Sequence, residues 1–164
     1  MARRELPPQA RLHELFDYKD GQLLWKISKG KAKKGSVAGC FTNYPYKQVR
    51  VDGVMHGLHR VIFLYHHGYC PDVIDHADAN ALNNDISNLR EATMSQNGLN
   101  RKTSPNSSTK IKNVCWYGKL QKYRVAIQVD NKYKHFGYYD DPELAELVAI
   151  EARDKYCGRF AHHG

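Results

Sequence analysis

Four residues in the middle of this chain restrict its fold and chemistry more than any other feature. Asp75 and His76 are adjacent, Asn88 follows after eleven intervening residues, and Asn97 after eight more. A carboxylate and an amide carbonyl are hard oxygen ligands of the kind that Mg²⁺ and Mn²⁺ take, and a neutral imidazole can accept a proton near neutral pH. The segment therefore predicts a base, an amide that orients the base and two metal ligands, which together suit phosphodiester hydrolysis.

The sequence around these residues resembles the HNH endonucleases of the His-Me finger class, in particular the homing endonucleases of phages and introns. Residues 75–90 fit the pattern D-H-x-D-x-N-x-x-x-N-x-x-x-N-L-R of that family, and His76, Asn88 and Asn97 stand at its three letters. The resemblance extends over residues 59–100. It implies a ββα-metal finger, in which the histidine ends a short strand, a loop and a second strand carry the middle asparagine, and a helix carries the last ligand.

The same resemblance implies a role for each residue. Asp75 and Asn97 are expected to bind Mg²⁺ or Mn²⁺, and His76 to act as general base toward a water molecule. Asn88 is expected to accept a hydrogen bond from the ring N–H of His76 and so to fix its tautomer. The reaction would be metal-dependent cleavage of double-stranded DNA, as a nick or through both strands. The other polar loop residues are expected to form Asx turns: Asp78, Asn80, Asn83 and Asn84.

The distribution of charge indicates a polyanionic partner. The chain has 164 residues, a net charge of +8 and a pI near 9.3, and no carboxylate occurs between Asp20 and Asp52. Such a basic run can follow a phosphate backbone, and this interpretation is preferred to a simple solvated loop, which Gly30 and Gly35 would favour. The basic residues in this gap are Lys26, Lys29, Lys31, Lys33, Lys34, Lys47 and Arg50. We expect Lys31, Lys33 and Lys34 to contact DNA.

No part of the sequence predicts a membrane segment or a secretion signal. No apolar run approaches the roughly 20 residues of a membrane span, and residues 1–8 lack the apolar stretch of a signal peptide. A cytoplasmic location is expected, in the host cell if a phage encodes the chain. The four cysteines form no C-x-x-C pair and are expected to be reduced packing residues.

Short periodic segments organise the N-terminal half. Residues 22–27 and 47–51 alternate as strands do, and Asp52-Gly53 is typical of a tight hairpin turn. Residues 59–68 are rich in apolar side chains and end in Gly68, which predicts a buried helix with a glycine C-cap. For His59, at the start of this helix, packing is favoured over a role in the site.

The C-terminal third has a different pattern. Residues 101–110 are polar and contain Pro105, which predicts a linker. Three strands are expected at residues 113–117, 123–129 and 133–137, followed by a helix with Asp141 as N-cap, Pro142 at its first position and Gly158 at its end. The apolar stripe of this helix is expected to be Leu144, Val148, Ala152 and Tyr156, with Ala145 and Ala149 beside it.

Residues 111–161 resemble the Apetala (ethylene-response-factor) type of DNA-binding domain. The matching residues are Val114, Trp116, the Tyr-Arg-Val-Ala-Ile of 123–127, the Phe-Gly-Tyr-Tyr of 136–139 and the Ala-rich helix ending in Tyr-Cys-Gly at 156–158. In that fold the sheet face away from the helix enters the major groove. Strand alternation puts Val125, Ile127 and Val129 toward the helix. The expected DNA-facing residues are Tyr117, Arg124, Gln128, Tyr133 and His135, although the dense arginines of the plant domains are missing.

The sequence therefore predicts an α+β fold. It consists of a small N-terminal sheet with a ββα-metal finger, then a three-stranded antiparallel sheet packed on one helix. The expected domains are an HNH endonuclease at 1–100, a linker at 101–110 and an Apetala-type domain at 111–164. Two alternatives are a catalytically silent DNA-binding regulator and an RNA-binding accessory protein. Target sequence and oligomeric state do not follow from the sequence.

Overall fold

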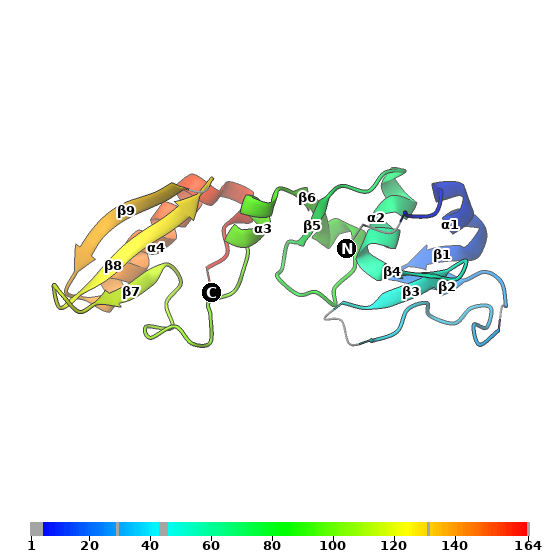
Figure 1. The fold of residues 1–164 in the computed structure, drawn as a ribbon, viewed down its shortest axis with the longest axis horizontal. Coiled ribbons are helices and arrows are strands. Elements are labelled where there is room, and N and C mark those ends of the chain that lie inside the picture. The colour runs from blue at the N-terminus through cyan, green and yellow to red at the C-terminus, as the bar shows by residue number, and fades with distance from the viewer. Residues whose placement is uncertain (1–4, 29, 43–45, 131, 164) are drawn as a thin grey trace. The chain divides into compact units, whose positions relative to one another are not determined.

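The computed structural model describes residues 5–28, 30–42, 46–130 and 132–163, and Lys29 of the basic run lies outside them. The chain divides into two compact units, Met1–Glu91 and Ala92–Gly164, whose elements are labelled in Figure 1. The N-terminal unit has α1 (Gln9–Leu15), β1 (Phe16–Lys19), β2 (Gln22–Trp25), β3 (Gln48–Val51), β4 (Val54–Gly57), α2 (Leu58–His67), β5 (Val73–His76), a 3₁₀ turn η1 (Ile86–Asn88) and β6 (Leu89–Ala92), which ends at the boundary. The C-terminal unit has α3 (Met94–Leu99), β7 (Val114–Tyr117), β8 (Lys122–Val129), β9 (Lys132–Tyr139), α4 (Pro142–Cys157) and a 3₁₀ turn η2 (Gly158–Phe160).

Aspartate–glycine pairs close the first two hairpins of the N-terminal unit. Asp20-Gly21 joins β1 to β2, and Asp52-Gly53 joins β3 to β4. All four residues have positive φ, at 48° and 75° in the first turn and 43° and 89° in the second. Two-residue hairpin turns of this kind need positive φ at both positions, which glycine adopts without strain and aspartate more readily than most residues. The predicted turn at Asp52-Gly53 is confirmed.

Helix α2 is the centre of the N-terminal core. It ends at Gly68, which has φ 74° and donates its N–H to the carbonyl of Leu64, as the glycine C-cap predicts. α1 and both hairpins supply the residues packed around it, so a single core supports the strands that follow. The buried cluster comprises Leu12, Leu15, Phe16, Leu23, Ala38, Val49, Val51, Leu58, Val61, Ile62, Phe63, Leu64 and Leu89.

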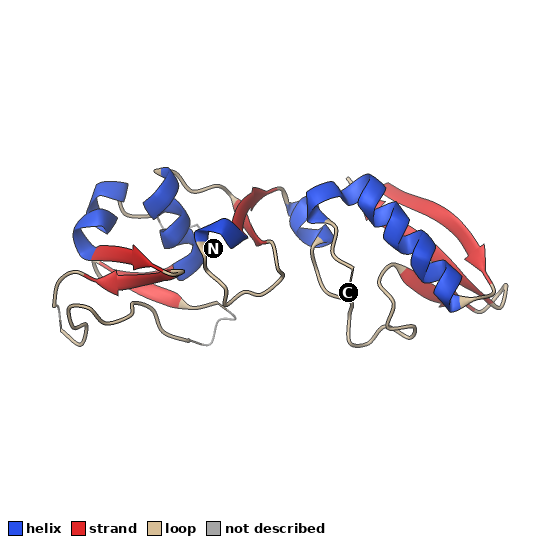
Figure 2. Cartoon of the chain, turned by 180° about the vertical axis from the view of Figure 1, so that it is seen from behind, coloured by secondary structure: helices blue, strands red, loops and turns tan. Residues whose placement is uncertain are grey.

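The C-terminal unit is an antiparallel meander, β7-β8-β9, with α4 packed along one face (Figure 2). The Asp141 carboxylate accepts from the N–H of Glu143, Pro142 opens α4, and Gly158 is its C-cap, as predicted. Val125 and Ile127 point to the helix side and are 0% and 1% exposed, which confirms the predicted alternation of β8.

The buried face of α4 differs from the predicted one. Leu144 is 47% exposed, whereas Ala145 and Ala149 are fully buried against the sheet with Val114 and Val125. Alanine has no side chain beyond Cβ, so a helix that presents alanines can approach a sheet closely, and the larger residues turn outward. The prediction is therefore wrong at Leu144, whereas Val148 and Ala152 pack in the core as expected, and so do the flanking Ala145 and Ala149.

A β-bulge changes the facing of residues in β9. Val125 pairs with Gly137 and Ala126 with His135, so Phe136 is an extra residue in the ladder. Gly137 has φ 119°, and a Cβ there would lie 2.9 Å from the Oη of Tyr139, so only glycine fits. Because of the bulge, Tyr138 pairs with Arg124 and shares its face of the sheet.

Helix α3 packs within the C-terminal unit. Thr93 and Gln96 form a capping box at its start, and Leu99 at its end contacts the cluster of Ile127, Ala152 and Cys157. The Lys112 ammonium also donates to the Leu99 carbonyl at 2.7 Å. The predicted division into an endonuclease domain at 1–100 and a DNA-binding domain at 111–164 stays a prediction. Within the described chain, no helix combines the length and apolar character needed to span a bilayer.

Candidate active site

The predicted acidic residue and histidine occupy the end of β5. Asp75 is 3% exposed and His76 is 7% exposed, and β5 pairs with β6 in a two-stranded sheet. The N–H of Ala77 donates to the Asn88 carbonyl at 2.9 Å, which ties the start of the intervening loop to its end. The paired strands and this hydrogen bond hold both side chains in buried positions where β5 meets the loop.

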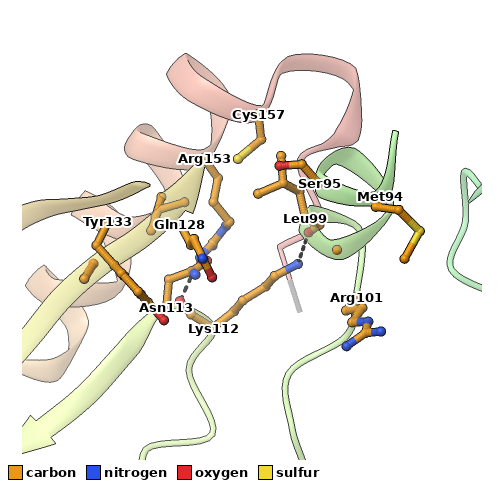
Figure 3. Close-up of a pocket in the computed structure, with 13 residues that line it drawn as sticks. Met94, Ser95, Leu99, Arg101, Lys112, Asn113, Gln128, Tyr133, Arg153 and Cys157 are labelled. Atoms are coloured by element: carbon orange, nitrogen blue, oxygen red, sulfur yellow. Dashed lines mark hydrogen bonds between the residues drawn. The ribbon is translucent and has the colours of Figure 1, made fainter. Parts of the chain in front are cut away.

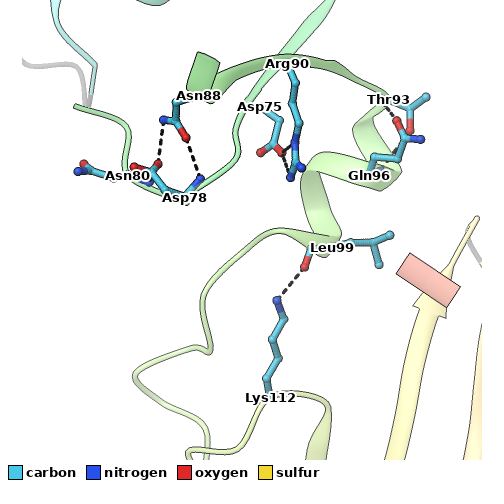
Figure 4. A network of polar contacts seen from close by, with 9 residues as sticks. All are labelled: Asp75, Asp78, Asn80, Asn88, Arg90, Thr93, Gln96, Leu99 and Lys112. Atoms are coloured by element: carbon cyan, nitrogen blue, oxygen red, sulfur yellow. Dashed lines mark hydrogen bonds and ion pairs between the residues drawn. The ribbon is translucent and has the colours of Figure 1, made fainter. Parts of the chain in front are cut away.

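Arg90 neutralises the buried carboxylate of Asp75. Its Nη2 lies 2.7 Å from Asp75 Oδ2, and its Nε donates to the same oxygen at 2.8 Å (Figure 4). Arg90 is the arginine of the Asn-Leu-Arg sequence that starts β6. A buried carboxylate needs such a partner to remain ionised. The motif includes Arg90, but the spacing of the motif does not predict its ion pair with Asp75.

The His76 ring is bonded to Asn84 rather than to Asn88. Its Nε2 lies 3.1 Å from Asn84 Oδ1, and Asn84 is itself only 5% exposed. This contact is compatible with the tautomer that carries its proton on Nε2, because the Asn84 amide oxygen can accept that proton. The structure therefore corrects two expectations: the amide beside the His76 ring is that of Asn84 and not that of Asn88, and Asn84 makes this contact instead of an Asx turn.

Asn88 instead fastens the loop between β5 and β6. Its Oδ1 accepts from the N–H of Asp78 at 3.0 Å, and its Nδ2 donates to Asp78 Oδ1 at 2.9 Å and to the Asn83 carbonyl at 2.8 Å. Burial raises the pKa of Asp78, but hydrogen bonds from Asn83, Asn80 and Asn88 outweigh it and lower the pKa overall. The expected Asx turns are present at Asp78, Asn80 and Asn83.

Two aromatic rings from distant parts of the chain lie beside His76. Tyr46 is nearly parallel to it, with ring centroids 6.0 Å apart and planes inclined by 16°. The His59 ring lies 5.6 Å from His76 and 4.9 Å from Tyr46. Tyr46 precedes β3 and carries no motif, so nothing in the sequence pointed to it. The sequence favoured a packing role for His59. In the structure its ring packs against Tyr46 and His76.

Burial lowers the pKa of His59 to about 3 from the usual 6.5, with the charges of His76 and Arg60 acting in the same direction. Between these pH values the unfolded chain binds a proton here and the folded chain does not. We therefore expect the free energy of unfolding to decrease as pH falls through this window, by at most about 1.4 kcal/mol per pH unit from this group. Stability should be unaffected by it above pH 6.5.

Chemical denaturation at pH 4 to 7 measures this effect. His59→Gln should show a shallower decline of stability toward low pH than the unmodified chain. His67→Gln, on the exposed side of the same helix, is the control and should follow the unmodified chain. Equal slopes for all three proteins would contradict a neutral, buried His59.

Asn97 lies on α3, in the C-terminal unit, and its backbone N–H donates to the Thr93 carbonyl. Its side chain is partly exposed. The capping box described above fixes the first turn of this helix, on which the Asn97 side chain stands. The residue predicted to be the second oxygen ligand therefore stands on a helical turn that the capping box stabilises. Its role as a ligand stays a prediction.

The strand register gathers the five predicted DNA-facing residues of the C-terminal unit on one face of the sheet. Gln128 pairs with Tyr133 and Ala126 with His135, and the Arg124 guanidinium lies 5.8 Å from the centre of the Tyr117 ring. This sheet face, on the side away from α4, also includes Lys122 and Tyr138, which the sequence did not predict. Regular alternation after Tyr133 and His135 would place Gly137 on this face of the sheet. The bulge shifts the register, so that Tyr138 lies on this face instead.

The lysines of the N-terminal basic run lie on the loop between β2 and β3. Lys31, Lys33 and Lys34 are all exposed. Local hydrogen bonds join described residues around these lysines: the N–H of Lys34 donates to Ser28 Oγ, and the Ser36 hydroxyl donates to the Lys33 carbonyl. The charges are therefore presented to solvent by a shaped loop, which suits either of the two interpretations left open for this run.

Comparison with known proteins matches the segment that carries the site. A family model described as HNH endonuclease matches residues 56–99. Protein 3.8 of Escherichia phage T7 is 32% identical over 90 residues, which cover 54% of this chain and 72% of that protein. This chain belongs to the family of T7 protein 3.8 and carries an HNH endonuclease domain at residues 56–99. No solved structure matches it.

The HNH segment contains all four residues of the predicted site. It begins at His56, in β4, and ends at Leu99, in α3, so it spans α2, β5, the Asn-rich loop and β6. The expectation of an HNH endonuclease domain is confirmed, and the chain is similar to a phage protein. The arrangement of the HNH segment as a ββα-metal finger and the Apetala-type character of residues 111–164 stay predictions.

Proposed function

We propose that this protein is a metal-dependent DNA endonuclease of the phage homing type. The observation that carries the proposal is the buried Asp75–His76 pair at the end of β5, inside the segment that matches HNH endonucleases. A carboxylate and an imidazole side by side can supply a cation ligand and a proton acceptor to the same phosphodiester.

His76 acts as the general base in this proposal. Water that attacks phosphorus must lose a proton, and a base already held in one tautomer and one orientation loses less entropy in the reaction. Asn84 fixes the tautomer, while the Tyr46 and His59 rings restrict the plane of the imidazole. Asn88 contributes indirectly, because it fixes the loop that carries Asn84.

Asp75 and Asn97 would hold Mg²⁺ or Mn²⁺. The support for this assignment is chemical: a carboxylate and an amide carbonyl are both hard oxygen donors of the kind that these ions take. When bound, the cation neutralises charge on the phosphate and on the departing oxygen. Arg90 would hold the Asp75 carboxylate by one oxygen and fix its direction.

DNA targeting is assigned to the C-terminal unit in this proposal. Arg124 and Gln128 have the donors and acceptors that bind guanine and adenine edges, and the tyrosines around them add contact area. The exposed lysines of the β2–β3 loop would bind phosphates without sequence preference. Whether one strand or both strands are cut depends on how many protein chains bind one DNA site.

Incubation of the purified protein with supercoiled plasmid tests the function. With Mg²⁺ or Mn²⁺ we expect nicked or linear products, and with a chelator we expect none. DNA binding without cleavage under any divalent cation would contradict the proposal and favour the silent regulator. Preference for RNA over duplex DNA in a competition experiment would favour the RNA-binding alternative.

The metal ligands have a separate signature. Asp75→Ala and Asn97→Ala should each raise the Mg²⁺ concentration at half-maximal cleavage by about 10-fold or more, because each removes one of two protein ligands. Asn80→Ala, in the loop but assigned only to an Asx turn, is the control and should leave that midpoint within about 2-fold. Unchanged midpoints in both ligand variants would remove Asp75 and Asn97 from the metal site.

The sheet face of the C-terminal unit makes a prediction about binding. Arg124→Ala combined with Gln128→Ala should weaken binding to the preferred DNA by about 1–3 kcal/mol for each base that the protein no longer reads, and should weaken binding to unrelated DNA much less. Lys155→Ala with Glu151→Ala, on exposed positions of α4, is the control pair. An equal decrease in affinity for all DNA sequences would show that these residues bind phosphates only.

A further inference from the structure

The C-terminal unit contains a cavity of about 470 Å³ between α3, β8 and the last turns of α4. Figure 3 shows the residues that line it. Leu99 and Ile127 form part of an apolar wall, while Gln128 and Tyr133 belong both to the cavity and to the sheet face proposed to bind DNA. The cavity therefore adjoins that face, and a group bound there could belong to a ligand lying on the sheet.

Two cationic side chains lie close together in this cavity. Arg153 extends from α4 and is 1% exposed, and its Nη1 donates to the Lys112 carbonyl at 2.8 Å (Figure 3). Lys112 donates to the Leu99 carbonyl. Burial and the charge of Arg153 lower the pKa of Lys112 to about 8, the raising effect of Cys157 being smaller. Arg101 adds a third cation at the exposed rim.

The positive charge in the cavity is not compensated within it. None of the described residues that line the cavity is an aspartate or glutamate. Arg153 Nη2 is buried and has no hydrogen-bond partner, while Nε is 3.5 Å from His163 Nδ1. A buried guanidinium is normally paired with an anion and fully hydrogen-bonded. An unpartnered donor, beside a second cation in a cavity large enough for a ligand, indicates a missing anion.

We propose that this cavity is a phosphate-binding site, in which Arg153 and Lys112 bind one phosphate group beside Gln128 and Tyr133. Arginine binds phosphate through paired N–H donors, and a lysine adds a point charge. The phosphate could belong to the backbone of bound DNA or to a free phosphate ion or monoester, and both present the same oxygens. Only the first source depends on the proposed function.

The primary test uses the full chain without DNA or metal. Inorganic phosphate is titrated at constant ionic strength, with chloride as the reference anion, and binding is followed by calorimetry and amide chemical shifts. We expect saturable binding that Lys112→Met weakens at least 10-fold and Arg101→Gln weakens about 3-fold. Lys155→Met removes the same charge from an exposed position of α4 and should leave the affinity within 2-fold.

Absence of saturable phosphate binding, or equal affinity in Lys112→Met and Lys155→Met, would overturn the proposal. Amide spectra of each variant report whether it is folded, and Arg101→Gln changes only the exposed rim, so the result does not depend on a buried substitution. Because no cleavage is measured, this outcome is independent of whether the protein is a nuclease.

Competition identifies the source of the phosphate. If a backbone phosphate of DNA occupies the site, saturating duplex DNA should displace inorganic phosphate, and Lys112→Met should reduce the slope of log affinity against log salt by about 1. If the site takes a free phosphate ion or monoester, duplex DNA should leave phosphate binding intact and the salt slope should be unchanged. Either result supports a phosphate site.

Discussion

Replacement of His76 by alanine is expected to lower the rate of DNA cleavage by about 10²- to 10⁴-fold, the usual contribution of a general base. DNA affinity should change by less than about 2-fold, because a neutral imidazole adds little to the charge that binds phosphates. Rates at saturating Mg²⁺ and binding in the presence of chelator measure the two quantities separately. The expected result is a protein that binds DNA normally and does not cut it.

Two further variants show whether His76 acts as a base or only as a packed ring. His67→Ala, an exposed histidine on α2, should retain the unmodified rate. Asn84→Ala should lower the rate less than His76→Ala does, since it frees the tautomer but keeps the imidazole. Cleavage by His76→Ala at the unmodified rate would exclude His76 as the base. A lower rate at neutral pH that recovers as pH rises would instead indicate that hydroxide replaces the missing base.

Local patterns explain what the sequence predicted correctly. Gly68 ends α2, Asp141 and Pro142 begin α4, and Asp52-Gly53 turns a hairpin, because each of these depends on backbone preferences of two or three adjacent residues. The adjacency of Asp75 and His76 likewise placed both at the end of one strand. In these cases the interaction that determines the structure lies within a few residues of the pattern.

The partner of His76 could not be predicted in the same way. Asn84 and Asn88 are four residues apart in a loop whose path is set by successive Asx turns, and either amide has the right chemistry. Motif spacing identifies Asn88 as an important residue, but it does not show which hydrogen bonds Asn88 makes. Tyr46, thirty residues before His76, is brought to the ring only by the tertiary fold, so no local signal could identify it.

Packing explains the errors in the C-terminal unit. Ala145 and Ala149 pack closely on the sheet as expected, but Leu144, which hydrophobic periodicity placed in the buried stripe of α4, is exposed. The bulge around Phe136 and Gly137 reversed the alternation of β9, so Tyr138 joined the sheet face. Both results depend on interactions between elements, which hydrophobic periodicity does not record.

The packing of α3 leads to the second large effect, in a fragment that ends at Asn106. Division of the chain at a linker of residues 101–110 predicts that such a fragment still nicks DNA, because it keeps the whole HNH segment. The structure predicts the opposite. Helix α3 has six residues, too few to be stable alone, and the groups that Leu99 contacts, Ile127, Ala152 and Cys157, are all absent from the fragment.

Unfolding of α3 would leave the proposed ligand Asn97 on a disordered segment. We therefore expect the fragment to cleave plasmid at least about 10²-fold more slowly than the full chain at moderate Mg²⁺, even though β5, β6 and Asp75 have their own core. In the full chain, Leu99→Ala should weaken the same packing and lower cleavage in the same direction. Met94→Ala, at a position of α3 that is 76% exposed, should not. Equal rates for fragment and full chain would show that α3 folds without the C-terminal unit, and would confine that unit to DNA targeting.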